Sequence, residues 1–297
     1  MSWFVKFWGT RGSIPVPGPR SRKYGGNTPC VEIHASPDPA LLICDGGTGL
    51  RELGLDLMRR RKGEPIRGHF LFSHTHWDHI QGFPFFIPAY QPQNEFLVYG
   101  TSPGDHRTFD LLSGQMRSEY FPVEFSELRA RITPADLGGG QAVLDGFSVR
   151  CLDLRHPGCA FAFAFEREGK KVVYATDTEL DLTPTDPGQP APEPAAIRSL
   201  PGALVELARG ADLLIGDGQY TDEEYLAHVG WGHSRATTLV DLAVAAGCRQ
   251  LAVFHHDPMQ SDRDVDRKIE LCRERATRHG SKLLVFGARE GLELRIG

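Results

Sequence analysis

One short stretch of the chain concentrates side chains that bind metal ions. Residues 73–79 read Ser-His-Thr-His-Trp-Asp-His, which places His74, His76, Asp78 and His79 within six positions. Imidazole nitrogens and carboxylate oxygens are preferred ligands of zinc, and carboxylates also suit manganese. The motif follows an apolar run at 69–72 that predicts a buried strand, and ligands of α/β proteins usually bind at the carboxyl ends of such strands. We therefore expect a metal site here.

Three further strand-like runs end in residues of the same kinds. His156 follows the run 147–154, Asp177 follows 171–175, and His255 follows 251–254. Together with the motif these make seven candidate ligands. Seven exceed the needs of one tetrahedral zinc ion but suit two metals that share a carboxylate, with room for a bridging water. We expect two divalent ions per chain, with zinc favoured and manganese or iron as alternatives.

The elements that must position these residues follow an α/β pattern. Apolar or alternating runs predict strands over 3–8, 30–34, 41–44, 69–72, 96–100, 147–154, 159–166, 171–175, 211–216, 251–254, 281–286 and 292–296. Helical spacing predicts helices over 50–60, 108–116, 235–246 and 262–279, and the end of another over 204–209. Residues 121–131 show no clear pattern, and 183–194 predict an exposed loop. We expect a single domain, 1–297.

The motif is similar to the signature of the metallo-β-lactamase superfamily, H-x-H-x-D-H, which stands here at residues 74–79. The resemblance runs from the turn at Gly9 through Asp45-Gly46-Gly47 to His255. It implies an α/β fold, a four-layered αβ/βα sandwich with the metals at one edge between the sheets. It also implies the ligand set: His74, His76 and His156 for the first metal, Asp78, His79 and His255 for the second, and Asp177 as the bridge.

A later stretch resembles one branch of that superfamily. Gly232-His233-Ser234 at an expected helix start, before a strand ending in Phe254-His255, is similar to the phosphodiesterases, which include RNase Z-type endonucleases and cyclic-nucleotide phosphodiesterases. In that branch the matching histidine approaches the scissile phosphate, so Asp78 and His233 are the expected catalytic residues. The alternative is that His233 is an ordinary residue at a helix start, where Ser234 could cap.

Other polar residues are candidates for supporting roles. The glycine turn after the first strand places Arg11 and Ser13 where they could meet an anion, although an ordinary turn explains it equally well. With Asn27 and His256 they are the candidate substrate-binding residues. Metal ligands are commonly oriented from behind by other polar groups. The candidates for that role are Asp45, Asp217 and Asp257.

Composition limits the classes of partner and the compartment. The 297 residues are 40% apolar and 24% charged, with a formal net charge of −5, so the whole chain offers no attraction to nucleic acid or anionic membranes. No apolar run approaches the roughly 20 residues that span a bilayer, and the amino terminus lacks a signal-peptide pattern. The six cysteines are scattered without a C-x-x-C pair, which favours free thiols and the cytoplasm.

The favoured function is that of a two-metal phosphodiesterase acting on a small nucleotide. The favoured substrate is a 3′,5′-cyclic nucleotide. The metals would convert a bridging water to the attacking hydroxide, and His233 would protonate the leaving oxygen. The alternative is an RNase Z-like RNA 3′-end processing endonuclease. Those enzymes grip tRNA with a long arm between the residues matching His156 and Asp177, which are 21 positions apart here. Nucleic acid is therefore disfavoured as a partner.

A third candidate function and the oligomeric state also follow from the resemblance. A thioester or lactone metallo-hydrolase is the remaining alternative, although the glyoxalase II kind lacks the His233 element. Phosphodiesterases of this branch are frequently dimers, so the resemblance implies a homodimer.

Overall fold

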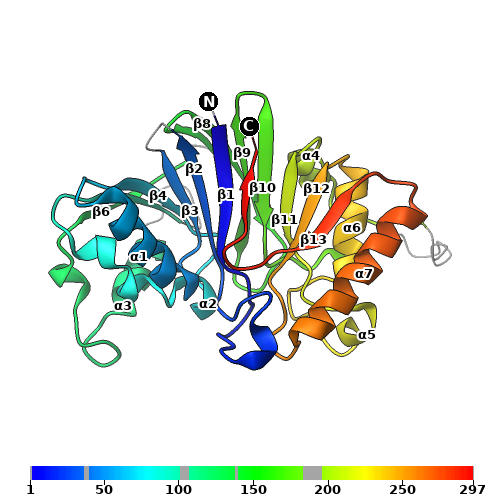
Figure 1. The fold of residues 1–297 in the computed structure, drawn as a ribbon, viewed down its shortest axis with the longest axis horizontal. Coiled ribbons are helices and arrows are strands. Elements are labelled where there is room, and N and C mark those ends of the chain that lie inside the picture. Colours follow the sequence, from blue (N-terminus) through cyan, green and yellow to red (C-terminus); the bar gives the residue numbers. More distant parts are fainter. Residues whose placement is uncertain (1, 37–39, 101–106, 138–139, 183–195, 297) are drawn as a thin grey trace.

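The computed structural model of the chain describes residues 2–36, 40–100, 107–137, 140–182 and 196–296. Within these ranges the chain forms two seven-stranded sheets that pack face to face, with helices over both outer faces (Figure 1). The expected αβ/βα sandwich is confirmed. The loop expected over 183–194 lies outside the described residues. None of the described helices is both long enough and apolar enough to cross a membrane.

The first sheet contains the strands from both ends of the chain. In spatial order its strands are β14 (Glu293–Arg295), β1 (Ser2–Gly9), β2 (Cys30–Ser36), β3 (Leu41–Cys44), β4 (Arg67–Leu71), β5 (Glu95–Tyr99) and β6 (Arg131–Ala135). The pairs from β14 to β3 are antiparallel, and those from β3 to β6 are parallel. Strands β2 and β3, both predicted from the sequence, pair with each other.

The second sheet repeats this mixture of directions. In spatial order its strands are β13 (Leu284–Gly287), β12 (Gln250–Phe254), β11 (Leu213–Asp217), β10 (Lys170–Ala175), β9 (Ala160–Arg167), β8 (Phe147–Leu154) and β7 (Gln141–Leu144). The pairs from β13 to β10 are parallel, and those from β10 to β7 are antiparallel. Strands β9 and β10 form an antiparallel hairpin around Glu168-Gly169.

Helices cover the outer face of each sheet. The described helices are α1 (Gly49–Arg61), α2 (Trp77–Ile80), α3 (Arg107–Gly114), α4 (Gly202–Ala208), α5 (Asp222–Tyr225), α6 (Ala236–Ala245) and α7 (Asp262–Arg278). Leucines of α1 pack on the first sheet, and apolar residues of α6 and α7 pack on the second. A capping box at Ser261 and Asp264 defines the start of α7.

The core between the sheets follows from alternating burial along the strands. In β1, Trp3, Val5 and Phe7 are buried while the residues between them are partly exposed, which is the period of a half-buried strand. The ring of Phe7 contacts that of Phe254 in the opposite sheet, with centroids 6.2 Å apart. Trp3 meets Phe147 edge to face at 5.1 Å. Strand β1 therefore packs one sheet against the other.

The structure differs from the sequence-based expectation in two respects. Strands β6 and β7 form where no strand is predicted from the sequence. Helix α6 begins at Ala236 with Arg235 at its N-cap, so Ser234 is not the cap. The Ser234 hydroxyl instead donates to the carbonyl of Thr178 and accepts from the Leu180 N–H. His233 therefore lies in a loop before the helix.

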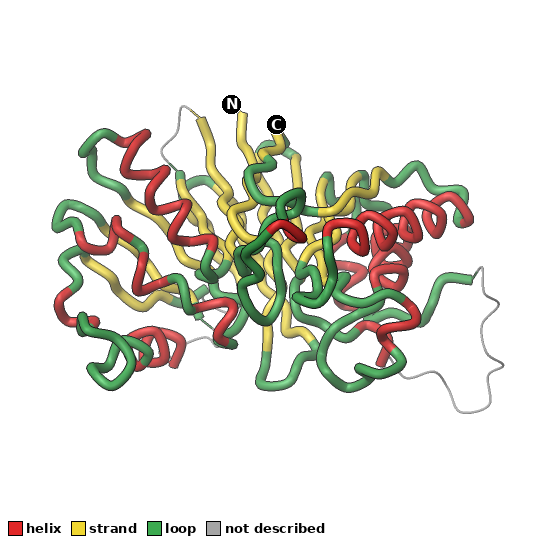
Figure 2. Tube along the Cα trace, turned by 60° about the horizontal axis from the view of Figure 1, so that its bottom comes forward, coloured by secondary structure: helices red, strands yellow, loops and turns green. Residues whose placement is uncertain are grey.

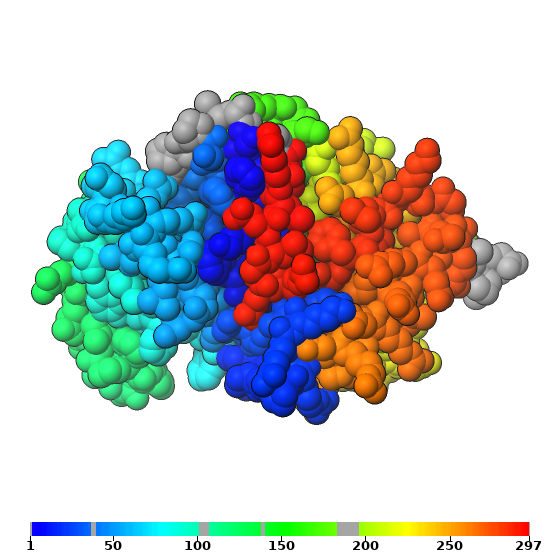
Figure 3. Space-filling model, viewed as in Figure 1, coloured from blue at the N-terminus to red at the C-terminus, as the bar shows by residue number. Residues whose placement is uncertain are grey.

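The loop after β1 packs against the second sheet's outer helix. Figure 3 shows this blue segment against the orange α7 at the lower edge of the molecule. The Tyr24 hydroxyl and the Lys23 ammonium both donate to Asp266 of α7. The loop thus joins the two halves at the edge where β1 ends.

We expect Phe7→Ala to lower the free energy of unfolding by about 3–5 kcal/mol, because it opens a cavity between the sheets. Phe4 is the matched control, since it lies on the outer face of the same strand and stacks on His34. Phe4→Ala should cost less than half as much. Denaturant unfolding measures both, and equal losses would contradict the assignment of the core.

Candidate metal centre

The carboxyl ends of several strands meet at one edge of the sandwich. Strand β4 leads into the motif at His74, and β8, β10 and β12 lead to His156, Asp177 and His255. Figure 2 brings this edge forward and shows it covered mainly by loops. Because β8, β10 and β12 run in the same direction within one sheet, their ends deliver side chains to the same place.

The seven expected ligands gather in two groups at this edge. The groups are His74, His76 and His156, and Asp78, His79, Asp177 and His255. Within each group the candidate ligand atoms all lie within 4.8 Å of one another. Both groups thus have the spacing of ligands around one ion each.

Asp177 lies between the two groups and turns one oxygen toward each. Its Oδ2 is 3.5 Å from His74 Nε2 and 3.9 Å from His156 Nε2. Its Oδ1 is 3.3 Å from His79 Nε2 and 3.4 Å from His255 Nε2. The position of Asp177 therefore suits a carboxylate shared by two ions.

The backbone at the strand ends is strained where it turns these side chains inward. Asp177 and His255 have φ values of 48° and 57°, and Asp45, at the end of β3, has 60°. Residues other than glycine rarely adopt positive φ, and such strain concentrates at functional sites. The surrounding packing therefore holds these residues in place at an energetic cost.

Two buried nitrogen atoms indicate that the donors fit a metal. The Nε2 atoms of His74 and His79 have no hydrogen-bond partner among the described residues. Burial lowers the pKa of His74 well below its usual value, which favours the neutral ring that metal binding needs. For His79, burial is outweighed by Asp177 and Asp78, which raise its pKa well above the usual value. The carboxylates thus favour positive charge at this position, as a cation would supply.

Asp45 holds the motif from behind and is fully buried. Its Oδ2 accepts from His79 Nδ1 at 2.8 Å and from the Tyr174 hydroxyl at 2.6 Å. Both Oδ atoms also accept from Ser73, Oδ1 from the backbone N–H and Oδ2 from the hydroxyl. With Nδ1–H donated to Asp45, the lone pair of His79 Nε2 is directed toward Asp177 and Asp78. The geometry supports the role expected for Asp45.

Two other histidines, His255 and His156, are oriented in the same way. His255 Nδ1 donates to Gln219 Oε1 at 2.8 Å, and His156 Nδ1 donates to the Gly232 carbonyl at 2.9 Å. Asp257 accepts from the Gln219 amide at 3.3 Å, so it is one step further from the ligands than expected. Neither Gln219 nor Tyr174 is predicted by the sequence.

His233 lies beside both groups. Its Nδ1 donates to Asp217 Oδ2 at 2.8 Å, and its ring stacks on His255 with centroids 4.9 Å apart. A ring nitrogen also lies within 4.8 Å of ligand atoms of His156 and Asp177. Burial opposes protonation, but the charge of Asp217 and its hydrogen bond outweigh it and raise the pKa to about 9. These interactions favour the imidazolium form of His233 beside the candidate ligands.

Glu179 fixes the loop that carries His233, a role that the sequence did not predict. Its Oε1 accepts from the Gly230 N–H and the Tyr225 hydroxyl, and its Oε2 accepts from the Gly232 N–H. The Gly232 carbonyl in turn binds His156. The Glu179 carboxylate thus holds the backbone on both sides of Trp231, and through the Gly232 carbonyl it also helps to position His156.

Three expected substrate-binding side chains are directed elsewhere, which corrects the expectation. Arg11 is buried and donates to the carbonyls of Gly25, Asp257 and Gln260. The Asn27 amide donates to Glu290. His256 is buried, donates to the Ala288 carbonyl and packs on Tyr24.

The glycine turn of residues 9–13 contributes by its backbone. The Ser13 N–H donates to Asp78 Oδ2 at 2.7 Å, so this residue supports a candidate ligand. A Cβ on Gly12 would lie 2.4 Å from the His255 ring. The turn therefore needs glycine because the ring of His255 passes next to it, and an anion is not required to explain the glycine.

Comparisons with known proteins agree on the fold. A family model described as "Beta-lactamase superfamily domain" matches residues 41–256. A protein named Ribonuclease Z from Methanosarcina acetivorans is 26% identical over 291 residues, covering 87% of this chain and 88% of that protein. The metallo-beta-lactamase fold protein YhfI from Bacillus subtilis has a TM-score of 0.67 at 17% identity, and human short-form tRNase Z has 0.61 at 18%. Each covers 99% of both chains.

We expect the protein to hold two ions per chain and Asp177→Ala to hold one or none, because the substitution removes the oxygens that face both groups. Turnover should fall by about 100-fold or more. Asp153→Ala is the control, since it removes an exposed carboxylate of β8. Elemental analysis counts the ions, and a variant that keeps two would exclude the shared-carboxylate role.

Proposed function

The chain belongs to the beta-lactamase superfamily and is a metal-dependent hydrolase, and we propose that it is a phosphodiesterase with two divalent ions. The observation that carries the proposal is the position of Asp177, with one oxygen toward each ligand group. His74, His76 and His156 would hold one ion, and Asp78, His79 and His255 would hold the other. Bound divalent ions lower the pKa of water and stabilise charge on phosphoryl oxygens.

His233 supplies the proton in this proposal. Asp217 accepts from Nδ1 and so leaves Nε2 as the donor on the other side of the ring. A positioned imidazolium protonates the oxygen that leaves phosphorus, which matters most for a poor leaving group such as a ribose alkoxide. Glu179 keeps the loop in place while the charge on the substrate changes.

RNA is the substrate class that the comparisons support best. The relative from Methanosarcina acetivorans is named Ribonuclease Z and aligns over most of both chains. We therefore place RNA 3′-end processing ahead of the 3′,5′-cyclic nucleotide favoured by the sequence, and nucleic acid becomes a plausible partner. A net charge of −5 does not oppose this, because binding depends on the local charge around the site.

A cyclic nucleotide is the second candidate, and the β9–β10 hairpin favours it. Arg167 and Lys170 pair across a two-residue turn at Glu168-Gly169, with both turn residues at positive φ. The interval between His156 and Asp177 is therefore filled by a tight hairpin. A small substrate does not need a long arm to hold it. Zinc as the metal, a homodimer and a cytoplasmic location stay predictions.

We expect the metal-replete protein to cleave a precursor tRNA with a 3′ trailer and to hydrolyse cyclic nucleotides more slowly. Turnover of both substrates, and of base-free methyl p-nitrophenyl phosphate, distinguishes the candidates. Cleavage of cyclic nucleotides alone would favour the second candidate. Hydrolysis of a thioester or lactone, without any phosphodiester, would contradict the proposal.

We expect His233→Ala to keep its metal content and to lose about 10²–10⁴-fold in turnover on a substrate with a ribose leaving group. The loss should be much smaller with p-nitrophenolate, which leaves without a proton. His228→Ala is the control, because that half-buried histidine stacks on Tyr220 and its Nδ1 donates to the Glu224 carbonyl. Equal losses on both substrates would instead assign phosphate binding to His233.

A further inference from the structure

A pocket of about 770 Å³ opens directly beside the metal-binding motif. Residues of α2 and α3 and of the segments that follow them line it, among them Trp77, Phe85, Leu111 and Tyr120. Its volume lies in the range of small-molecule sites. Thr75 and Trp77 also line it, and they alternate along the chain with His74, His76 and Asp78. The pocket is therefore next to the candidate ligands along the chain, although the ligands themselves do not line it.

The aromatic side chains of this pocket present their rings to solvent. Trp77 is 79% exposed, Tyr120 77% and Phe85 53%. Aromatic side chains normally bury most of their area in a core or an interface. Three exposed rings around one pocket therefore offer apolar area to a ligand, and flat rings suit a flat aromatic partner.

Charge at the same pocket fits an anionic ligand. Arg107 and Arg117 line it together with the aromatic residues. Asp110 is the acidic side chain in the lining, and a carboxylate accepts hydrogen bonds from the amino groups of a base. A ligand with an aromatic base and an adjacent phosphate matches these groups.

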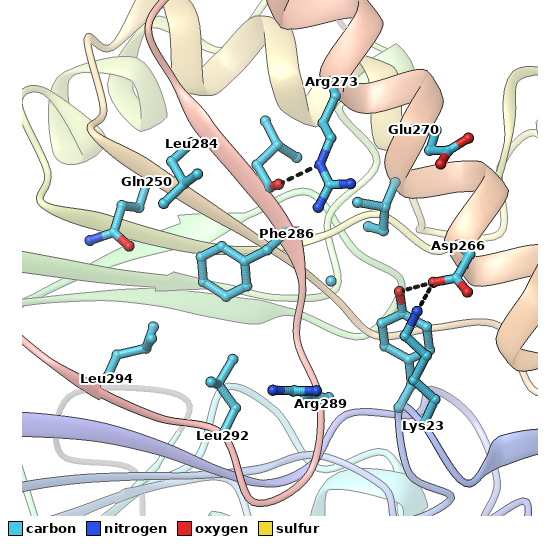
Figure 4. Close-up of a pocket in the computed structure, with 14 residues that line it drawn as sticks. Lys23, Gln250, Asp266, Glu270, Arg273, Leu284, Phe286, Arg289, Leu292 and Leu294 are labelled. Carbon is cyan, nitrogen blue, oxygen red and sulfur yellow. Dashed lines mark hydrogen bonds and ion pairs between the residues drawn. The ribbon is translucent and has the colours of Figure 1, made fainter.

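Two other pockets of similar volume contain no residue of the motif. One has about 720 Å³ and lies between β13, β14 and α7 (Figure 4), and the other has about 710 Å³ and is lined by residues of β4 and β5. In the first of these, Asp266 accepts from Lys23 and Tyr24, and Arg273 donates to the Val285 carbonyl. Of these three pockets, the one at Trp77 is lined by residues of the motif, Thr75 and Trp77.

We propose that the pocket between α2 and α3 holds the nucleobase next to the scissile phosphate, stacked on Trp77. The proposal rests on the proposed phosphodiesterase function and assigns the base-binding subsite of the same centre. Trp77 is here a binding residue, and it recognises any base, because every base has an aromatic face. The subsite serves a nucleotide in RNA and a cyclic nucleotide alike.

The test compares two adenosine nucleotides with a sugar phosphate that lacks the base. Affinities of the metal-replete protein for adenosine 5′-monophosphate, adenosine 3′-monophosphate and ribose 5-phosphate are measured by calorimetry. We expect Trp77→Ala to weaken at least one adenosine nucleotide by about 5- to 100-fold and to leave ribose 5-phosphate within about twofold. Trp77→Phe should restore much of the affinity because it keeps a ring.

A matched tryptophan serves as the control. Trp231 is also strongly exposed but does not line the pocket, so Trp231→Ala should keep the preference for the adenosine nucleotides. Equal weakening of all three ligands by Trp77→Ala, or no preference for a base in the unaltered protein, would overturn the proposal. Failure of the phosphodiesterase proposal shows separately, as no hydrolysis of base-free methyl p-nitrophenyl phosphate.

Discussion

The arrangement of the whole site depends on the contacts of the buried Asp177 carboxylate with the two groups of candidate ligands. Its two oxygens face two different groups of histidines, and the strained backbone at the end of β10 holds it there. A buried negative charge is costly unless positive charge compensates it. The same carboxylate therefore explains why the histidines gather at this position and why the site suits cations.

At this edge of the sandwich, side chains from the two sheets meet. Strands β3 and β4 of the first sheet deliver Asp45 and the motif, while the second sheet delivers His156, Asp177 and His255. The core between the sheets, with Phe7 against Phe254, fixes the distance across which they meet. Hydrogen bonds from Asp45, Gln219 and the Gly232 carbonyl then set the direction of each ring.

The sequence predicts the strands and the groups at their ends because both signals are local. An apolar run followed by His or Asp can be recognised in the sequence without knowledge of distant contacts. Partners far along the chain leave no such signal: Tyr174 reaches Asp45 from 129 positions away, and Gln219 reaches His255 from 36. The same holds for Arg11, whose carbonyl partners at Asp257 and Gln260 are brought near only by the folded chain.

Short strands at the edges of the sheets are also difficult to predict from local sequence patterns. Strand β6 reads Arg-Ile-Thr-Pro-Ala, and β7 has four residues, so neither carries enough alternation to predict pairing. Each forms because the strand beside it, β5 or β8, offers an open edge. By contrast, the long alternating run of β8 is sufficient to predict a strand without knowledge of its neighbours.

The most direct test of the central claim is a crystal structure of the protein grown with zinc, with anomalous scattering measured on both sides of the zinc edge. We expect two zinc peaks, one among His74, His76 and His156 and one among Asp78, His79 and His255, with one oxygen of Asp177 bound to each. A single peak, or two peaks with Asp177 bound to neither or only one, would contradict this account.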